Sequence, residues 1–514
     1  MTRTLARLFA TPERRLIAAG VLLTLVYALF SRGVYHSDEH FQILEYAHMK
    51  LFGTPTPEHL AWEYRLQMRP GVQPFVAWLV GRGLSAAGIY SPFVLVGILQ
   101  LLSGALSTSV LLYFYRTVRD ELGDEHAQRW FLVLGFGLWF LAYLHVHFSA
   151  EMLAGNLLVL LAMLTVRCVR GECSAAWRGG LLLGLVAGAT FVVRYQTGFA
   201  LAGYGVWLLV YCRRRRLYAG IATGVCLALA VGLLADRWLY GVWTLAPLNY
   251  LKGNILDGHM LAFGAEPWWY YFTAAVLEGG VLFGVLALGA TLWFFGRYPR
   301  HIVTWMLVPF LAVHFFLGHK ELRFFFPVLF FMPWFIVLWV RSFPRRISGS
   351  RGWRWTVGAM AMFNIGAAVY TLAAPTPDIC FYRMMRRHCA DGEPVVALSL
   401  EGEKSYYAMP QPVAAGEGGA MEARFYMPEG FDCRYFATRE QLEAAARSLS
   451  DEGRRVMIFS PDPELAEKSG LALRKIVWSP YPRWVVRYFN FNDWTRYSVR
   501  SKNVYEVAGL FENN

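Results

Sequence analysis

Long apolar runs separated by short polar segments fill the first three quarters of the chain. Runs long enough to cross a bilayer as helices recur about eleven times. They cover residues 17–31, 92–115, 130–148, 152–166, 179–193, 197–212, 217–235, 273–296, 302–317, 324–340 and 355–373. A further run at 72–89 contains Gln73, Pro74 and Arg82, and it would break the alternation of sides, so we predict a surface or re-entrant helix there. The pattern predicts an all-α polytopic membrane protein.

The pattern changes near residue 375 to the mixture typical of a soluble domain. Residues 395–400 and 455–460 resemble buried strands, and residues 439–449 resemble a helix with alanines on one side. We therefore predict a membrane domain at 1–374 and a small soluble α/β domain at 375–514. An odd number of spans would place this second domain on the side opposite the N-terminus.

Composition and charge agree with a membrane protein and indicate its orientation. The chain is 56% hydrophobic and 16% aromatic, with a mean hydropathy of +0.35. Its net charge of +13 comes from arginine clusters that all fall on the N-terminal side if eleven spans are present. The positive-inside rule makes that side the cytoplasm, so the charge indicates topology and not nucleic-acid binding. The first run lacks a small-residue cleavage site, and we expect it to remain as an anchor.

The sequence contains no pattern that indicates a resident metal or cofactor. Seven cysteines are scattered without a C-x-x-C pair, and no metal-ligand spacing, P-loop or G-x-G-x-x-G occurs. Cys380, Cys389 and Cys433 lie in the region predicted to be outside, where one disulfide could join two of them, with the pairing left open.

An acidic stretch follows the first apolar run and holds three carboxylates, three histidines and a glutamine: His36, Asp38, Glu39, His40, Gln42, Glu45 and His48. Ordinary helical spacing would bring Glu39 and Gln42 together on one face, and likewise Asp38 and Glu45. We predict an amphipathic helix at the membrane surface with acidic groups at its start. The alternative is a solvated loop followed by a helix that Ser37 or Asp38 caps.

Two outer loops, at 32–91 and 236–272, combine aromatic and charged residues. Aromatic rings can anchor a loop at the membrane interface, or they can stack on the apolar faces of a sugar while carboxylates bind its hydroxyl groups. The residues concerned are Trp62, Glu63, Arg69, Asp236, Arg237 and Trp268.

Cations gather in a short outer turn at 318–324, where His319, Lys320 and Arg323 form a candidate phosphate site. The alternative is a helix-end cluster that Glu321 neutralises. Glu151 and Arg194 also lie at outer helix ends. A charge in the bilayer costs about 2–3 kcal/mol, so these side chains should face a polar cavity or one another. For Arg194, snorkelling and phosphate contact both remain open.

Together these features suit the transfer of a sugar from a lipid phosphate. The sugar would lie in water, the phosphate among lipid headgroups and the polyprenyl tail in the bilayer. A carboxylate would take the proton of the acceptor hydroxyl, and cations would stabilise the departing phosphate. Direct attack opposite the phosphate inverts the anomeric carbon, so one catalytic carboxylate can suffice.

The motifs in this order resemble glycosyltransferase family 22, the dolichyl-phosphate-mannose-dependent mannosyltransferases with the GT-C architecture. His36-Ser37-Asp38-Glu39 is similar to the family's His-Pro-Asp-Glu motif, and residues 319–324 are similar to its His-Lys-Glu-x-Arg-Phe signature. The segments around Trp62, Arg69, Asp236 and Trp268 look most like the branch that adds the third mannose of GPI anchors. The departures, Ser37 for Pro and Arg-Tyr-Gln-Thr at 194–197 for Arg-Pro-Thr, replace no acid or base.

The resemblance implies a role for each motif. Asp38 would be the catalytic base, with Glu39 a second candidate or a sugar-hydroxyl ligand. His319, Lys320 and Arg323 would bind the donor phosphate, and no metal would be needed. The substrate pocket would be shaped by His36, Gln42, Trp62, Glu63, Arg69, Asp236, Arg237 and Trp268.

Short arginine-rich inner loops and the compact length suggest a bacterial chain in the inner membrane, and a eukaryotic chain would lie in the endoplasmic reticulum membrane. The predicted partners are polyprenyl-phosphate-mannose, a glycolipid or glycan acceptor and the lipid bilayer. The same mechanism could instead transfer arabinose, aminoarabinose or glucose. A lipid transporter would carry ionisable residues at mid-membrane and internal repeats, and a non-catalytic scaffold would not need Asp38.

Overall fold

The computed structural model describes most of the chain, namely residues 11–31, 33–34, 36–172, 176–212, 215–373, 379, 382–383, 385–386, 395–400, 423–428, 432–460, 462, 464–477 and 503–508. The chain divides into two compact units. The first contains Met1–Ser31 and Leu66–Leu372, and the second contains Arg32–Arg65 and Ala373–Asn514. The acidic stretch therefore clusters with C-terminal residues, while the domain boundary at 374 stays a prediction.

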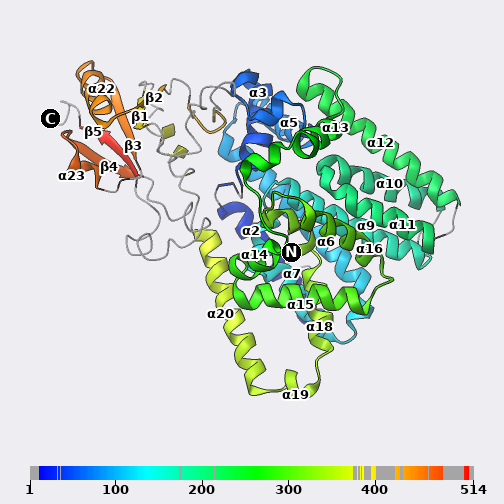
Figure 1. The fold of residues 1–514 in the computed structure, drawn as a ribbon. Coiled ribbons are helices and arrows are strands. Elements are labelled where there is room, and N and C mark those ends of the chain that lie inside the picture. The colour runs from blue at the N-terminus through cyan, green and yellow to red at the C-terminus, as the bar shows by residue number, and fades with distance from the viewer. Residues whose placement is uncertain are drawn as a thin grey trace. The chain divides into compact units, whose positions relative to one another are not determined.

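The described residues of the first unit form helices joined by loops, with no strand among them (Figure 1). Its elements are α2 (Pro12–Phe30), α5 (Val72–Ala86), α6 (Pro92–Leu122), α7 (Glu125–Gly137), α8 (Trp139–Leu144), α9 (Ala150–Val169), α10 (Ala176–Val193), η3 (Tyr195–Thr197), α11 (Gly198–Tyr211), α12 (Arg215–Tyr240), α13 (Ala246–Leu251), η4 (Lys252–Leu256), η5 (His259–Phe263), α14 (Tyr270–Glu278), α15 (Val281–Arg297), α16 (Ile302–Phe316), η6 (Leu322–Phe325), α17 (Phe326–Leu329), α18 (Met332–Arg341), α19 (Arg345–Ser348) and α20 (Arg351–Ala373).

Several of these helices have the length and composition of membrane spans. Among the described residues, α6, α9, α12 and α20 are long and apolar enough to cross a bilayer, and α10, α15 and α16 contain shorter apolar helices. The multi-span character expected from the sequence is therefore present. The number of eleven spans and the membrane placement of α5 stay predictions.

Three apolar runs that we expected to be continuous are broken. The run at 273–296 divides into α14 and α15 at Gly279 and Gly280. The run at 130–148 divides into α7 and α8 at Leu138. Asn364 of α20 satisfies the backbone at this break, because its amide donates to the carbonyl of Gly137 at 2.7 Å and accepts the N–H of Trp139 at 3.0 Å. A break among apolar helices needs such a partner, since no water is available to the freed groups.

The run at 324–340 is bent by 67° between Leu322–Leu329 and Met332–Arg341. Pro327 and Pro333 stand in the first turns of α17 and α18. Because proline lacks an N–H and disfavours helical backbone in the residue before it, each proline can start a helix more easily than continue one. The expected single span over this run is therefore a broken span or a re-entrant pair.

Glycines allow α10 and α12 to pack side by side (Figure 1). A Cβ on Gly180 or Gly184 would overlap a backbone carbonyl of α12, and a Cβ on Gly220 or Gly224 would overlap one of α10. Small residues at four-residue spacing let membrane helices approach closely, where van der Waals contact replaces the missing hydrophobic driving force.

The second unit begins with the acidic stretch. A π-helix, η1 (Glu39–Leu44), continues directly into α3 (Glu45–Phe52), and η2 (Pro57–His59) and α4 (Trp62–Arg65) follow. The expected helix is therefore present. However, Glu39, His40, Phe41, Ile43 and Leu44 are all buried, so η1 is not a helix with one solvated face.

The remainder of the second unit contains a five-stranded sheet in the order β2-β1-β3-β5-β4. The strands β1 (Val395–Leu400) and β3 (Arg455–Ser460) lie where strands were expected, and α22 (Arg439–Asp451) covers the expected helix. Strand β1 pairs in parallel with β2 and β3, while β5 is antiparallel to β3 and β4. The other elements are β2 (Asp432–Phe436), α23 (Leu465–Lys468), β4 (Leu473–Val477) and β5 (Asn503–Val507).

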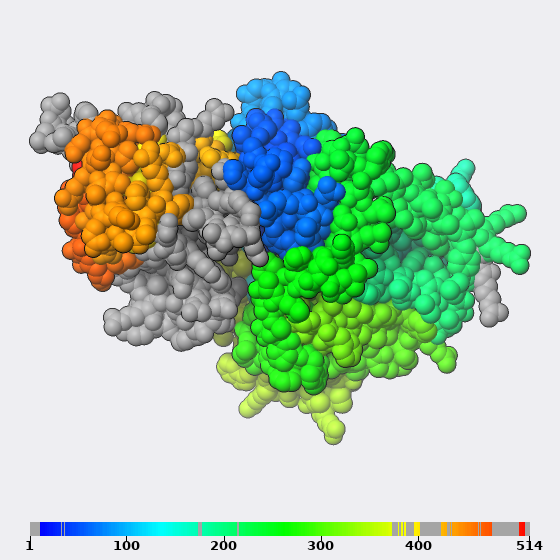
Figure 2. Space-filling view, turned by 45° about the horizontal axis from the view of Figure 1, so that its top comes forward, coloured from blue at the N-terminus to red at the C-terminus, as the bar shows by residue number. Residues whose placement is uncertain are grey.

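Helix α22 covers this sheet with an apolar stripe. Leu442, Ala446 and Leu449 recur at four- and three-residue spacing and pack on Val396 and Ile458 of the sheet. Thr438 and Gln441 form a reciprocal capping box at the start of the helix. The opposite side of α22 is at the surface, where its atoms are orange in Figure 2. The predicted disulfide depends on Cys380 and Cys389, which lie outside the described residues.

Candidate active site

Asp38 is the more accessible of the two adjacent carboxylates in the acidic stretch. Its side chain is 26% exposed, whereas Glu39 is 5% exposed. The backbone N–H of Asp38 donates to Nδ1 of His36 at 3.2 Å, and the same nitrogen lies 3.4 Å from the Asp38 carboxylate. Asp38 makes no side-chain capping bond, which argues against its being only a helix cap. Its carboxylate can be reached by a proton donor.

Two further predicted residues meet in this unit. The Gln42 amide donates to the Glu63 carboxylate at 3.1 Å, which joins η1 to α4. Glu63 is 7% exposed, and Trp62 beside it is partly buried. Tyr46 and Tyr64 stack edge to face at 5.1 Å and pack these helices together. His36, Asp38, Glu39, Gln42, Trp62 and Glu63 thus all belong to one compact unit.

The π-helix changes the position that we expected for Glu45. Ordinary helical spacing places Glu45 on the face of Asp38, but the structure pairs Glu45 with His40, five residues earlier, at 2.7 Å. Both carboxylate oxygens of Glu45 also accept the N–H of Phe425, at 3.0 and 3.2 Å. The expectation of a shared Asp38 and Glu45 face assumed 3.6 residues per turn, which η1 does not have.

In the first unit, Glu151 at the start of α9 binds two arginines. One oxygen of this carboxylate accepts from Arg194 at 2.8 Å and from Arg323 at 3.3 Å. Glu151 is 4% exposed, and Arg323 is 9% exposed. The expectation that Glu151 and Arg194 face one another is confirmed. Because a buried charge must be paired, this contact holds the cation of Arg323 at these helix ends.

Glu321 brings a second carboxylate to the cationic turn. It accepts from Nε of Arg323 and, at 3.1 Å, from Nη2 of Arg323. It also lies 2.9 Å from Nε2 of His319. Nδ1 of His319 is 3.1 Å from the carbonyl of Gly264, so both ring nitrogens face acceptors. This arrangement favours the imidazolium, and the hydrogen bond to Glu321 raises the pKa of His319.

Lys320 joins this turn to the loop at 236–272. Its ammonium donates to the carbonyl of Glu266 at 2.8 Å and to the carbonyls of Leu317 and Gly318. The side chain is 5% exposed, and burial lowers the pKa of Lys320. Lys320 could bind a phosphate only if its ammonium first released one of these carbonyls.

Arg69 and Asp236 are brought together through the backbone around residues 69–71. The Asp236 carboxylate accepts the N–H of Gly71 at 2.7 Å. The Tyr240 hydroxyl accepts the N–H of Arg69 at 3.1 Å and donates to its carbonyl at 2.7 Å. The guanidinium of Arg69 lies 5.7 Å from the ring of Tyr250. Asp236 therefore fixes the entry to α5, which the sequence did not indicate.

Each of the two remaining predicted residues lies beside a tryptophan ring. Arg237 lies 5.8 Å from the ring of Trp243. Trp268 is 61% exposed and packs edge to face against Trp269. Exposed rings of this kind suit a membrane interface as well as a sugar face.

The cationic residues His319, Lys320 and Arg323 are brought together, and Glu151, Arg194 and Glu321 join them in one network. The sequence showed Glu151 and Arg194 as charges at helix ends. It did not show that they meet Arg323, because residues 151, 194 and 323 lie far apart along the chain. The pairing of His40 with Glu45 was missed because nothing in the sequence indicated a π-helix.

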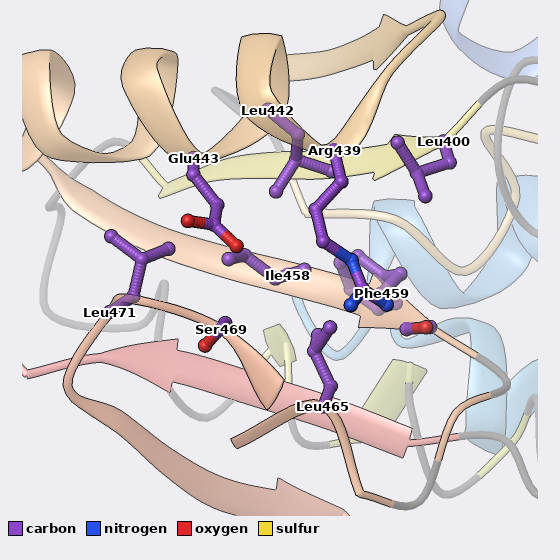
Figure 3. A pocket seen from close by; sticks show the side chains of 10 residues that line it. Leu400, Arg439, Leu442, Glu443, Ile458, Phe459, Leu465, Ser469 and Leu471 are labelled. Carbon is purple, nitrogen blue, oxygen red and sulfur yellow. The ribbon is translucent and has the colours of Figure 1, made fainter. Parts of the chain in front are cut away.

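A cavity is present in the second unit, under α22 (Figure 3). Apolar side chains such as Leu442, Ile458 and Leu465 line most of it, together with Arg439 and Glu443. It involves none of the residues predicted to bind sugar or phosphate. Among the residues that the structure describes, no three His, Cys, Asp or Glu side chains are grouped so that they could hold a metal ion.

The amino-acid sequence of the chain is similar to those of known proteins. Residues 17–388 match the model of the Alg9-like mannosyltransferase family. The mannosyltransferase APTG1 of Arabidopsis thaliana is 26% identical over 319 residues, which are 62% of this chain and 56% of the relative. The GPI alpha-1,2-mannosyltransferase 3 of Homo sapiens is 27% identical over 307 residues, 57% of this chain and 51% of the relative. The chain thus spans about half the length of the curated relatives that it matches.

A solved structure shows the same fold. ArnT from Cupriavidus metallidurans, bound to undecaprenyl phosphate, superposes with a TM-score of 0.53 at 13% identity, over 96% of this chain and 97% of that chain. The chain therefore shares the mostly helical GT-C architecture.

Proposed function

Because the chain belongs to the Alg9-like mannosyltransferase family, we propose that it transfers mannose from polyprenyl-phosphate-mannose to a hydroxyl of a glycolipid or glycan on the extracytoplasmic face of the membrane. The observation that carries this proposal is the extent of the family match. It runs over residues 17–388 and so includes both the carboxylate stretch at Asp38 and the cationic turn at His319.

In the proposed reaction, the acceptor oxygen attacks the anomeric carbon opposite the phosphate. A new carbon–oxygen bond forms, and the bond from that carbon to the phosphate oxygen breaks, so the configuration inverts. The Asp38 carboxylate takes the hydroxyl proton as the attack proceeds and later returns it to water. Its accessibility suits this role better than the burial of Glu39, which we assign to binding a sugar hydroxyl.

The departing phosphate takes the electron pair of the broken bond and needs positive charge. Arg323 and His319 would supply it directly, and Lys320 would supply it by releasing a carbonyl. If the phosphate displaces the Glu321 carboxylate, Arg323 and His319 are paired with an anion both before and after the phosphate binds. Since these cations can serve as the electrophilic catalyst, we expect transfer to persist in EDTA.

The relatives suggest the chemical class of both substrates. ArnT binds undecaprenyl phosphate, which supports a polyprenyl phosphate as the carrier. The Homo sapiens relative is named a GPI alpha-1,2-mannosyltransferase, which supports a glycolipid acceptor. We place the N-terminus in the cytoplasm and the site on the outer side, in the inner membrane of a bacterium or the endoplasmic reticulum membrane of a eukaryote. His36, Gln42, Trp62, Glu63, Arg69, Asp236, Arg237 and Trp268 would shape the pocket.

The test is transfer of radiolabelled mannose from synthetic polyprenyl-phosphate-mannose in membranes that contain matched amounts of each protein. We expect Asp38→Asn to lower the rate by about 10²–10⁴-fold, as is usual for loss of a general base. Glu58→Gln is the matched control, because Glu58 is an exposed carboxylate in the same loop. It should transfer mannose like the wild type.

Each other outcome is informative. Equal transfer by Asp38→Asn and wild type would exclude Asp38 as the base, and Glu39→Gln would be tested next. Transfer of arabinose, aminoarabinose or glucose, but not mannose, would change the donor sugar and keep the mechanism.

A further inference from the structure

The acidic stretch is held by contacts that the proposed reaction does not use. Glu45 is completely buried and His40 is 5% exposed, and the two side chains are hydrogen-bonded to each other at 2.7 Å. Burial of an ionisable carboxylate is costly unless its oxygens are hydrogen-bonded. Glu45 meets this need with His40 and with the N–H of Phe425.

The same two residues are also joined through the backbone. The N–H of Glu45 bonds to the carbonyl of His40, which closes the five-residue turn of η1. In an ordinary α-helix, residues five apart are turned by about 140° from one another around the axis, so the side chains would not meet. The pairing of His40 with Glu45 therefore stabilises a π-helical turn over an α-helical one.

Aromatic side chains fix His40 from the other directions. Its ring stacks on Tyr382 at 6.2 Å with an interplanar angle of 9°, and lies 5.5 Å from the ring of Tyr426. Phe41 and Phe425 approach it edge to face. The residues near 382 and 425 belong to the same compact unit as the acidic stretch. The C-terminal part of the chain thus binds His40 and Glu45 directly.

We infer that His40 and Glu45, together with the N–H of Phe425, are positioning residues that hold η1 as a π-helix and so set the direction of the Asp38 carboxylate. Asp38 directly precedes η1. If η1 became an α-helix, the Asp38 side chain would turn around the helix axis by about 100° for each residue by which the register shifts. The C-terminal segment at 423–428 thereby acquires a function in catalysis. The expected effect on catalysis rests on the proposed function, whereas the expected effect on the π-helix η1 does not.

The first measurement is hydrogen exchange on the full-length protein in detergent, comparing wild type, Glu45→Ala and Glu58→Ala. Glu45→Ala should increase exchange in the peptides that cover residues 39–45 and 425 and leave the helices of the first unit unchanged. Glu58→Ala should match the wild type throughout, because Glu58 is exposed. Unchanged exchange at 39–45 in Glu45→Ala would overturn the inference.

The second measurement separates positioning from substrate binding. Glu45→Ala should lower kcat by about 10–100-fold, as displacement of a catalytic group by about 1 Å can do. Its Kd for polyprenyl phosphate should stay within about twofold of the wild-type value, because it removes no group that we assign to the phosphate. Full activity in Glu45→Ala, or an equal loss in Glu58→Ala, would refute positioning.

A milder variant keeps the test valid if Glu45→Ala is unfolded. Glu45→Gln retains an oxygen that can accept the N–H of Phe425, so it should show a smaller loss of kcat and a smaller gain of exchange than Glu45→Ala. Activity and exchange that fail to change in parallel would overturn the inference. If the wild type transfers no mannose, the proposed function is wrong, and exchange alone decides whether His40 and Glu45 hold the π-helix.

Discussion

At the scale of single residues, the cationic turn carries its own anion. Glu321 binds both His319 and Arg323, as the self-neutralised alternative required. Its side chain is 29% exposed, whereas that of Arg323 is 10% exposed. The carboxylate is therefore the more accessible partner. An incoming phosphate can replace it without removing Arg323 from Glu151, which holds the guanidinium from the other direction.

This geometry predicts a pH dependence of phosphate binding. The hydrogen bond to Glu321 raises the pKa of His319 above its ordinary value of 6.5. Because this pKa is raised, the positive charge of His319 is fully present below pH 6.5 and is lost as the pH rises through the raised pKa. Affinity for polyprenyl phosphate should therefore fall as the pH rises from 6.5 through the raised pKa of His319.

The phosphate itself also titrates, so variants are needed to assign the effect. Binding should be measured by titration between about pH 5.5 and 8.5. The fall should be smaller in His319→Gln than in the wild type, and in Glu321→Gln it should move to lower pH. A profile in His319→Gln identical to that of the wild type would show that His319 does not contribute charge to the phosphate.

At this scale, site residues could be predicted from the sequence where the residues that act together are close in the sequence. The carboxylates near Asp38 and the cations near His319 were visible because each group is contiguous in the sequence. Glu151 could be recognised as a costly charge, but its contact with Arg323 depends on helix packing. The position of Glu45 was predicted wrongly, because spacing alone cannot distinguish a π-turn from an α-turn.

At the scale of helices and strands, the apolar runs predicted where helices occur better than where they are interrupted. The break at Leu138 depends on Asn364, more than two hundred residues later. No local pattern around residue 138 could show that its backbone groups have this partner. In contrast, β1, β3 and α22 fall at the expected places, because their strand and helix patterns are local.

The pairing of α10 with α12 gives a test at this scale. A methyl group on Gly184 would overlap the carbonyl of Ile221, so Gly184→Ala should destabilise the protein by about 1–3 kcal/mol. Gly205→Ala in α11 is the control, because nothing beyond its own stretch of helix lies within 4 Å of its Cβ position, and it should be neutral or stabilise by up to about 1 kcal/mol. Thermal unfolding in detergent would measure both. Equal unfolding temperatures for both variants would mean that α10 and α12 do not pack as closely as described.

At the scale of the whole molecule, a loop near the start of the chain makes buried contacts with residues near its end. The loop at 32–65 clusters with the C-terminal residues in one unit, and the remaining helices form the other. Long loops of a membrane protein can be ordered by a soluble domain when the two share buried contacts, as Glu45 and Phe425 do here. This requires both segments to lie on the same side of the membrane.

That requirement makes the orientation of the chain testable. Ser342 lies exposed between α18 and α19 beside Arg341 and Arg345, on the side that the positive-inside rule assigns to the cytoplasm. Asp257 lies exposed in the loop at 236–272, which we predict to be outside. In right-side-out vesicles, an impermeant maleimide should label Asp257→Cys before lysis and Ser342→Cys only after lysis, each measured above the parent chain with its seven cysteines. The reverse order would invert the topology and place the cationic turn in the cytoplasm. The proposed donor would then have to present its sugar on the inner side, where Asp38 and the C-terminal unit would also have to lie.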